Sequence, residues 1–344
     1  MSLWWLPALV LLASAGLTGL VLRYALARRL FDIPNARSSH VIPTPRGGGV
    51  AIVFTFLLAL PVLAFEGLAS WPLVWALLGA GGAVALLGFL DDHGHIPARW
   101  RLSGHFICAA WASFWLGGLP ALTLFGVDIQ LGWLGHALAL IGLVWLLNLY
   151  NFMDGIDGIA SIEAISVCLG GALLYLCVGH PELIAMPATL AAAVLGFLLW
   201  NFPPARIFMG DAGSGFLGMV LGVLSLHAAW VSPSLLWGWL ILLGVFIVDA
   251  TFTLFSRLLR GERIHEAHRS HAYQHASRQY KAHLPVMLAV GLMNLFWLLP
   301  IAMAVVLGHF DPVVGIALAY IPLLLLAKGF RAGAKEWADV DMKK

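Results

Sequence analysis

The sequence predicts an all-α, polytopic integral membrane protein, and three observations carry this prediction. Hydrophobic residues make up 61% of the chain and charged residues only 10%, and the mean hydropathy is +0.92. Apolar runs of about 17–25 residues, long enough to cross a hydrocarbon core of roughly 30 Å, recur along the whole chain. These runs are continuous rather than alternating, which argues against a transmembrane β-barrel.

About eleven transmembrane helices are predicted, in a single transmembrane domain that occupies residues 1–344. The candidate spans are 3–22, 47–65, 71–90, 104–120, 131–147, 159–178, 183–200, 214–230, 235–255, 286–307 and 312–327. When alternate connections are assigned to opposite sides, all 19 lysines and arginines fall on one side. The positive-inside rule then predicts an N-terminus outside and a C-terminus inside, in the cytoplasm.

The inside loops concentrate the polar residues and are expected to form the active site together. These loops are 23–46, 91–103, 148–158, 201–213 and 256–285. The first loop ends in Pro45-Arg46-Gly-Gly-Gly49, which indicates a shaped turn entering the second span. Arg46 is interpreted either as an anion contact or as a charge that only sets the topology.

The loop 91–103 opens on two adjacent carboxylates, Asp91 and Asp92, at the end of the third span. Carboxylates at a helix C-terminus oppose the helix dipole, so their presence there indicates a bound cation or a proton that must be accepted. Arg99 and Arg101 follow, and arginine suits phosphate oxygens because it can grip them with two donors. The alternative is that these arginines neutralise the two aspartates.

The stretch Asn148-Leu-Tyr-Asn-Phe-Met-Asp-Gly-Ile-Asp-Gly158 carries two amides and two carboxylates between two apolar runs. Asn148, Asn151 and Asp154 are three residues apart, so on a helix they share one face, and Asp157 follows. Oxygen ligands without thiols favour a hard cation such as Mg²⁺, usually held together with substrate phosphates. A helix cap with solvated aspartates is the alternative.

Two further loops carry candidate residues. Asp211 precedes a Gly-Ser-Gly turn that opens a span, and such a turn offers a carboxylate to a metal and N–H groups to phosphate, or else an ordinary helix cap. The last loop is rich in arginine and histidine, which favours a cationic lid over an anionic substrate, with a histidine metal site as the alternative. Asp249, inside the ninth span, is a functional candidate or an ion-pair partner of Arg257.

These motifs resemble the polyprenyl-phosphate N-acetylhexosamine-1-phosphate transferases of glycosyltransferase family 4. The family includes the phospho-MurNAc-pentapeptide transferases and the undecaprenyl-phosphate GlcNAc-1-phosphate transferases. The resemblance covers essentially the whole chain. It is carried most specifically by Gly88-Phe-Leu-Asp-Asp92, by the Asn148–Gly158 stretch and by Gly210-Asp-Ala-Gly-Ser214.

The resemblance implies roles residue by residue. Asp91 and Asp92 match paired aspartates that deprotonate or position the lipid phosphate, and Asp154 and Asp157 match the acidic motif on the nucleotide-sugar side; these four are the expected catalytic residues. Asn151 and Asp211 match the ligands of Mg²⁺, with Mn²⁺ as an alternative cofactor. The expected substrate-binding residues are Arg46, Arg101, Asn148, Arg263, His268, Arg269 and His271.

The last loop departs from the family pattern, because Tyr273 and Gln274 stand where other members have histidines. This resembles the O-antigen-initiating branch. The implied reaction transfers a sugar-1-phosphate from a UDP-N-acetylhexosamine to undecaprenyl phosphate and releases UMP, at the cytoplasmic face of a bacterial inner membrane. No nucleic-acid partner is expected, and a homodimer is left open. A secondary transporter and a CDP-alcohol phosphotransferase are the alternative functions.

Overall fold

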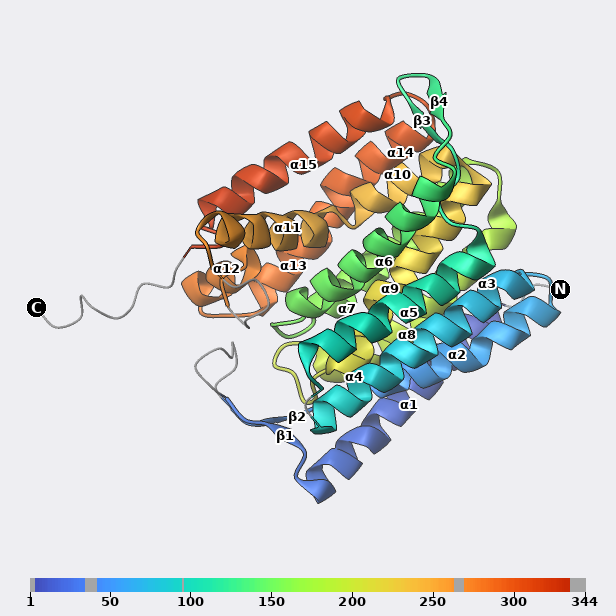
Figure 1. Cartoon of the computed structure of the whole chain (residues 1–344). Coiled ribbons are helices and arrows are strands. Elements are labelled where there is room, and N and C mark those ends of the chain that lie inside the picture. Colours follow the sequence, from blue (N-terminus) through green and yellow to red (C-terminus); the bar gives the residue numbers. More distant parts are fainter. Residues whose placement is uncertain (1–3, 35–41, 95, 263–268, 335–344) are drawn as a thin grey trace, which may run out of the picture.

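The computed structural model describes residues 4–34, 42–94, 96–262 and 269–334, and within these ranges the chain is a bundle of helices that lie side by side (Figure 1). The α-helices are α1 (Trp5–Arg28), α2 (Gly49–Phe65), α3 (Trp71–Ala76), α4 (Gly82–Gly94), α5 (Ala98–Leu116), α6 (Trp133–Met153), α7 (Ile159–Cys177), α8 (Ala185–Asn201), α9 (Asp211–Val231), α10 (Pro233–Leu242), α11 (Gly244–Leu259), α12 (Ala272–Tyr280), α13 (Leu284–Met293), α14 (Leu299–Val306) and α15 (Pro312–Gly329).

Three short helices connect some of these segments, and two small hairpins complete the regular structure. The short helices are the π-helices η1 (Leu77–Gly81) and η3 (Asn294–Leu298) and the 3₁₀-helix η2 (Pro181–Ile184). Strands β1 (Phe31–Asp32) and β2 (Thr44–Pro45) pair antiparallel, as do β3 (Leu122–Leu124) and β4 (Val127–Ile129). The all-α prediction is therefore confirmed.

Eight helical segments in the described part of the chain are long and apolar enough to cross a membrane, or nine if the bent pair α10–α11 is one span. The protein is thus a multi-pass membrane protein. Each of the eleven predicted spans falls on a helix, but α2 has only 17 residues, and α5 carries Arg99 and Arg101 in its first turn. The number eleven and the orientation of the termini stay predictions.

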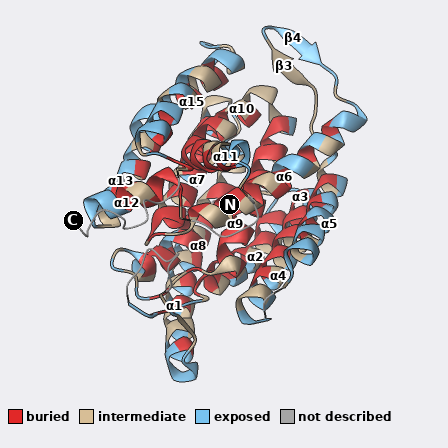
Figure 2. Ribbon diagram, turned by 60° about the vertical axis from the view of Figure 1, so that its left-hand side comes forward, coloured by how far each residue is buried: buried red, intermediate tan, exposed pale blue. Residues whose placement is uncertain are grey.

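Helix α9 is the centre of the bundle. It packs against α2, α4, α6 and α10, and most of its length is buried. Figure 2 shows this arrangement, with the buried residues at the middle and the exposed ones on the peripheral helices. Because α9 begins at Asp211, the first turn of the most buried helix stands at the end of the bundle where the acidic motifs lie.

The loop that leads into α2 is bound to the segment that enters α9. Arg46 and Phe208 form an isolated parallel β-bridge. The N–H groups of Gly47 and Gly48 donate to the Phe208 carbonyl (3.1 and 2.9 Å), and the N–H of Gly49 donates to the Met209 carbonyl (2.9 Å). The three glycine N–H groups therefore join two loops that are about 160 residues apart in the sequence and are not available to an anion.

Candidate active site

Asp91 lies in the last turn of α4, where one backbone N–H and one guanidinium bind its carboxylate. The Asp91 carboxylate accepts a hydrogen bond from the backbone N–H of Ile96 (2.7 Å) and forms an ion pair with the Arg101 guanidinium. The same guanidinium lies 3.8 Å from the Asp211 carboxylate. Arg101 thus links the end of α4 to the start of α9, which agrees with the neutralising alternative; a phosphate contact by Arg101 stays a prediction.

Asp92 faces the N-terminus of α9. Its carboxylate accepts hydrogen bonds from the backbone N–H groups of Asp211 and Ala212 and lies 3.7 Å from the Arg46 guanidinium, which also donates to the Asp92 carbonyl. These N–H groups therefore meet a carboxylate of the protein, not the phosphate predicted for the turn. The approach requires Gly88, because a Cβ there would lie 2.5 Å from the Asp211 carbonyl carbon.

The end of α6 brings the amide and the third carboxylate to the same place. The Asn151 amide donates to the Ser214 hydroxyl (3.1 Å) and also bonds the Asp211 carboxylate. Asp154 follows one turn later. Burial raises the pKa of the Asp154 carboxyl well above its ordinary value of 3.8, and the charges of Asp211, Asp157 and Asp92 raise it further. Asp91, Asp92, Asp154, Asp211 and Asn151, which we call the acidic cluster, thus meet at the ends of α4, α6 and α9.

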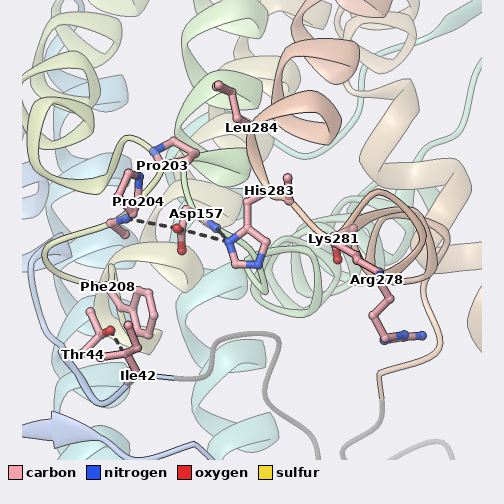
Figure 3. Close-up of a pocket in the computed structure, with 13 residues that line it drawn as sticks. Ile42, Thr44, Asp157, Pro203, Pro204, Phe208, Arg278, Lys281, His283 and Leu284 are labelled. Carbon is pink, nitrogen blue, oxygen red and sulfur yellow. Dashed lines mark hydrogen bonds and ion pairs between the residues drawn. The ribbon is translucent and has the colours of Figure 1, made fainter.

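Asp157 turns to a different partner. Its carboxylate accepts the backbone N–H of Ala205 (3.0 Å) and lies 3.1 Å from Nδ1 of His283, and the Asp157 backbone nitrogen lies 3.3 Å from the same Nδ1. Figure 3 shows the two side chains pointing toward one another above a cavity. This cavity, of about 610 Å³, is lined by Asp157, His283, Pro203, Phe208, Arg278 and Lys281 among others, and we call it the loop pocket.

His271 lies inside the protein rather than at a surface. Its side chain is only 1% exposed, its Nδ1 is 3.4 Å from the Asp249 carboxylate, and its ring stacks on Phe152 and Tyr273. Asp249 also accepts the backbone N–H groups of Ala272 and Tyr273 (2.9 and 3.0 Å), so it holds the first turn of α12. A substrate contact by His271 stays a prediction. The structure shows it in a buried tie between α11 and α12.

Helix α12 in turn reaches the acidic cluster through Tyr273. The Tyr273 hydroxyl donates to the Phe152 carbonyl (2.9 Å), in the last turn of α6. Gly155 is required for this approach, because a Cβ at that position would lie 2.2 Å from the Tyr273 hydroxyl and 3.1 Å from the Gln274 amide nitrogen. The two residues that depart from the family pattern therefore pack directly on the Asp154-Gly155 turn.

The other predicted substrate-binding residues are placed as follows. The Asn148 amide donates to the Val144 carbonyl one turn back (2.7 Å) and lies 3.5 Å from Nδ1 of His105 in α5. Arg269 lies beside α12, and its carbonyl accepts from Arg278 (3.1 Å). Arg263 and His268 lie outside the described residues. The roles predicted for all of these residues stay predictions.

The donor set suits a hard divalent cation held jointly with a substrate. No group of three histidine, cysteine or acidic side chains within the described residues has metal-site geometry. Asn151 and Asp211 nevertheless offer two adjacent oxygen ligands, and Asp154 adds negative charge nearby. Mg²⁺ prefers such oxygen ligands and fills the rest of its shell with water and phosphate. The residues present therefore fit Mg²⁺, which stays a prediction.

Sequence reasoning missed several residues that hold the site together. His283 was only one of many basic residues in its loop, and Ser214 was seen only as part of a turn. Glu163 lies inside the predicted span 159–178 and is buried in α7. Its position could have identified it, because an acid inside a span is a functional candidate by default. Their partners lie between 63 and 131 residues away, so no local spacing could identify them.

Comparison with known proteins agrees with this architecture. Residues 74–229 match the model of glycosyl transferase family 4. The decaprenyl-phosphate N-acetylglucosaminephosphotransferase of Mycolicibacterium smegmatis is 31% identical over 91% of this chain and 89% of its own length. A probable undecaprenyl-phosphate N-acetylglucosaminyl 1-phosphate transferase of Bacillus subtilis is 29% identical over 75% and 72%. The phospho-N-acetylmuramoyl-pentapeptide-transferase of Moorella thermoacetica is 32% identical over 53% and 61%.

The helical bundle, the acidic cluster and these relatives together define the class: a multi-pass membrane transferase. The chain belongs to glycosyl transferase family 4.

Proposed function

We propose that this protein transfers N-acetylhexosamine-1-phosphate from a UDP-sugar to a polyprenyl phosphate such as undecaprenyl phosphate, with release of UMP. The strongest support is the convergence of four carboxylates, one amide and two guanidinium groups from four distant segments at one end of a membrane bundle. Curated relatives act, by their names, on polyprenyl phosphates and amino sugars. The site faces the cytoplasm of a bacterial inner membrane in this proposal.

The two substrates differ in solubility, and the described part of the chain contains a cavity that suits each of them. The loop pocket carries Arg278, Lys281 and His283 opposite Phe208, which suits an anionic, partly aromatic ligand such as a nucleotide. A second cavity of about 380 Å³ lies between α6, α9, α10 and α15 and is lined almost wholly by apolar side chains, including Leu146, Leu149 and Ile247. An isoprenoid chain suits this second cavity, which we call the apolar cavity.

The chain's own residues support a phosphoryl transfer at the acidic cluster. Arg101, shared between Asp91 and Asp211, stands ready to share the charge of a phosphate group. Asp91 serves as the base that accepts a proton from the acceptor phosphate, and the Ile96 N–H holds its carboxylate in place. Mg²⁺, held by Asn151 and Asp211, would neutralise the diphosphate and stabilise the leaving UMP. Asp154 or another aspartate acting as a covalent nucleophile is the competing route.

The branch of the family is part of the proposal. Tyr273 and Gln274 replace histidines on the Asp154-Gly155 turn, and this departure supports an O-antigen-initiating enzyme, which forms the first lipid-linked intermediate of a cell-envelope polysaccharide.

The decisive experiment measures UMP release by the purified protein with undecaprenyl phosphate and each of several UDP-N-acetylhexosamines. Release that depends on both substrates is expected, together with a lipid-linked sugar diphosphate of matching mass. UMP release without the lipid, or no release with any donor, would contradict the proposed function. Transport of an intact sugar nucleotide into proteoliposomes would instead favour the transporter alternative.

A further inference from the structure

Helix α7 buries an acid that the proposed chemistry does not use. Glu163 lies in the second turn of α7, and its side chain is 0% exposed. Within the residues that the structure describes, no lysine, arginine or histidine forms an ion pair with Glu163. An acid inside a membrane bundle is costly unless its oxygens are bonded. The groups that bond the Glu163 oxygens are therefore what makes its burial possible.

One partner is Asn294, the first residue of the π-helix η3; the backbone N–H of Phe246 in α11 also bonds the Glu163 carboxyl. The Asn294 amide nitrogen lies 2.7 Å from Oε2 of Glu163 and 2.6 Å from the Ser166 hydroxyl. The Ser166 hydroxyl itself donates to the Ile162 carbonyl (2.8 Å), so its oxygen must accept from Asn294. This fixes the orientation of the amide. Both side-chain N–H groups of Asn294 thus donate to residues of α7.

A π-turn places Asn294 where it can do this. The segment η3 interrupts the span between α13 and α14, and such single π-turns redirect side chains and are frequent at functional sites. Helices α7 and α13 both start at the loop pocket and pack on one another. The residue just before α13 is His283, and Asp157 lies two residues before α7. Two ties therefore join the same pair of helices: Asp157–His283 at the pocket and Glu163–Asn294 within the bundle.

The loop pocket lies across this pair of helices. One wall consists of Asp157 with Pro203 and Ala205, and the other consists of Arg278, Lys281 and His283 with the first residue of α13. A shift or rotation of α13 against α7 therefore changes the spacing of the two walls. Neither Glu163 nor Asn294 lines the apolar cavity.

We infer that Glu163 and Asn294 are a positioning pair, which fixes α13 against α7 and thereby sets the spacing of the loop pocket for the soluble nucleotide-sugar. This inference rests on the proposed function, in that the loop pocket holds the donor and the apolar cavity holds the lipid. The pair acts through its hydrogen bond, so an amide at position 163 can replace the acid.

The test compares KM for the UDP-sugar and KM for undecaprenyl phosphate in Glu163→Leu, Asn294→Ser and Glu163→Gln. The first two variants are expected to raise the donor KM roughly 5–30-fold, with the lipid KM changed less than about twofold. Glu163→Gln keeps an acceptor for Asn294 and is expected to restore the donor KM. Ser161→Ala, at a buried hydroxyl two residues away with no hydrogen-bond partner in the described structure, is the matched control.

A double variant sharpens the test. Glu163→Leu combined with His283→Gln is expected to raise the donor KM by less than the product of the single effects, because both changes loosen the same pair of helices. Equal changes in both KM values, an unchanged donor KM in folded Asn294→Ser, or a Glu163→Gln variant as impaired as Glu163→Leu would overturn the inference. Absence of UMP release by the wild-type protein in the same assay would instead contradict the proposed function.

Discussion

Asp154 and Asp157 are identical side chains three residues apart, and the protein places them in opposite environments. Asp154 lies in the acidic cluster, where burial and the charges of Asp211, Asp157 and Asp92 raise its pKa. Asp157 faces the loop pocket, where a backbone N–H and His283 hold its carboxylate. Asp154 is thus short of positive charge, whereas Asp157 has its partners already in place.

This difference separates a region of the site where chemistry is expected from a region that holds its neighbours in position. A carboxylate that lacks positive charge is one that a cation or a proton completes, so the acidic cluster is where chemistry is expected. A carboxylate that is already bonded serves to hold a neighbour in position. Asp157 was predicted to be catalytic, and its contacts favour a positioning role for it at the donor side.

The largest expected effect concerns the acidic cluster and its cation. Asp211→Ala removes one of two adjacent oxygen ligands and one partner of Arg101, so turnover is expected to fall to background, as it should in excess chelator. UMP release measures both. Asp128→Ala, in the β3–β4 hairpin, is the control and should keep wild-type turnover. Full activity in excess chelator would contradict the assignment of a metal ion to the acidic cluster.

The second effect separates base chemistry from structure at Asp91. Asp91→Asn keeps an oxygen for the Ile96 N–H but cannot accept a proton, so kcat is expected to fall by about 10²–10⁴-fold if general-base catalysis is lost. The thermal unfolding midpoint in detergent reports whether the fold survives. A variant with wild-type kcat would show that Asp91 only ends its helix.

The third effect tests the comparison directly. Asp157→Asn and His283→Gln are each expected to raise the donor KM about tenfold and to change kcat little, because the two side chains hold a pocket wall. Initial rates at varied UDP-sugar and saturating lipid measure this. If Asp157→Asn instead lowers kcat as strongly as Asp91→Asn, then Asp157 belongs with the acidic cluster.

The smallest effect is on stability. The raised pKa of Asp154 means that the folded protein holds this proton more tightly than the unfolded chain does. Raising the pH above the unfolded value of about 3.8 therefore costs folding free energy. Asp154→Asn is expected to raise the unfolding midpoint at pH 7 by about 2 °C or more, and the gain should shrink as the pH falls toward 4. A midpoint difference that does not vary with pH would contradict the assigned environment of Asp154.

The sequence predicted the helices well, because a membrane span is specified by a long apolar run and needs no knowledge of its neighbours. It also predicted which motifs meet, since Asp91, Asp92, Asn151 and Asp211 all end or begin helices on one side of the bundle. The sequence predicts eleven spans, whereas eight or nine helical segments in the described part of the chain are long and apolar enough to cross a membrane. Helix α2 has only 17 residues, and α5 has two arginines in its first turn.

Side-chain direction could not be predicted in the same way. The spacing by three placed Asn148 on one face with Asn151, yet its amide bonds the Val144 carbonyl and faces α5. The triple glycine predicted a shaped turn, but the sequence did not show that its N–H groups bond the chain before α9. In each case the hydrogen-bond partner is a backbone group, either one turn back in the same helix or in a distant segment. Residue spacing does not show which of the possible partners a polar group will bond.

The 69° bend between α10 and α11 has a consequence for the surroundings of the protein. Helix α11 carries Asp249, Asp249 holds the first turn of α12, and Tyr273 of α12 bonds the last turn of α6 beside Asp154. The tilt of α11 in the bilayer is thereby coupled to the shape of the acidic cluster. Hydrocarbon thickness changes helix tilt at modest cost. Turnover measured in lipids of increasing acyl length is therefore expected to vary even when both substrates are saturating.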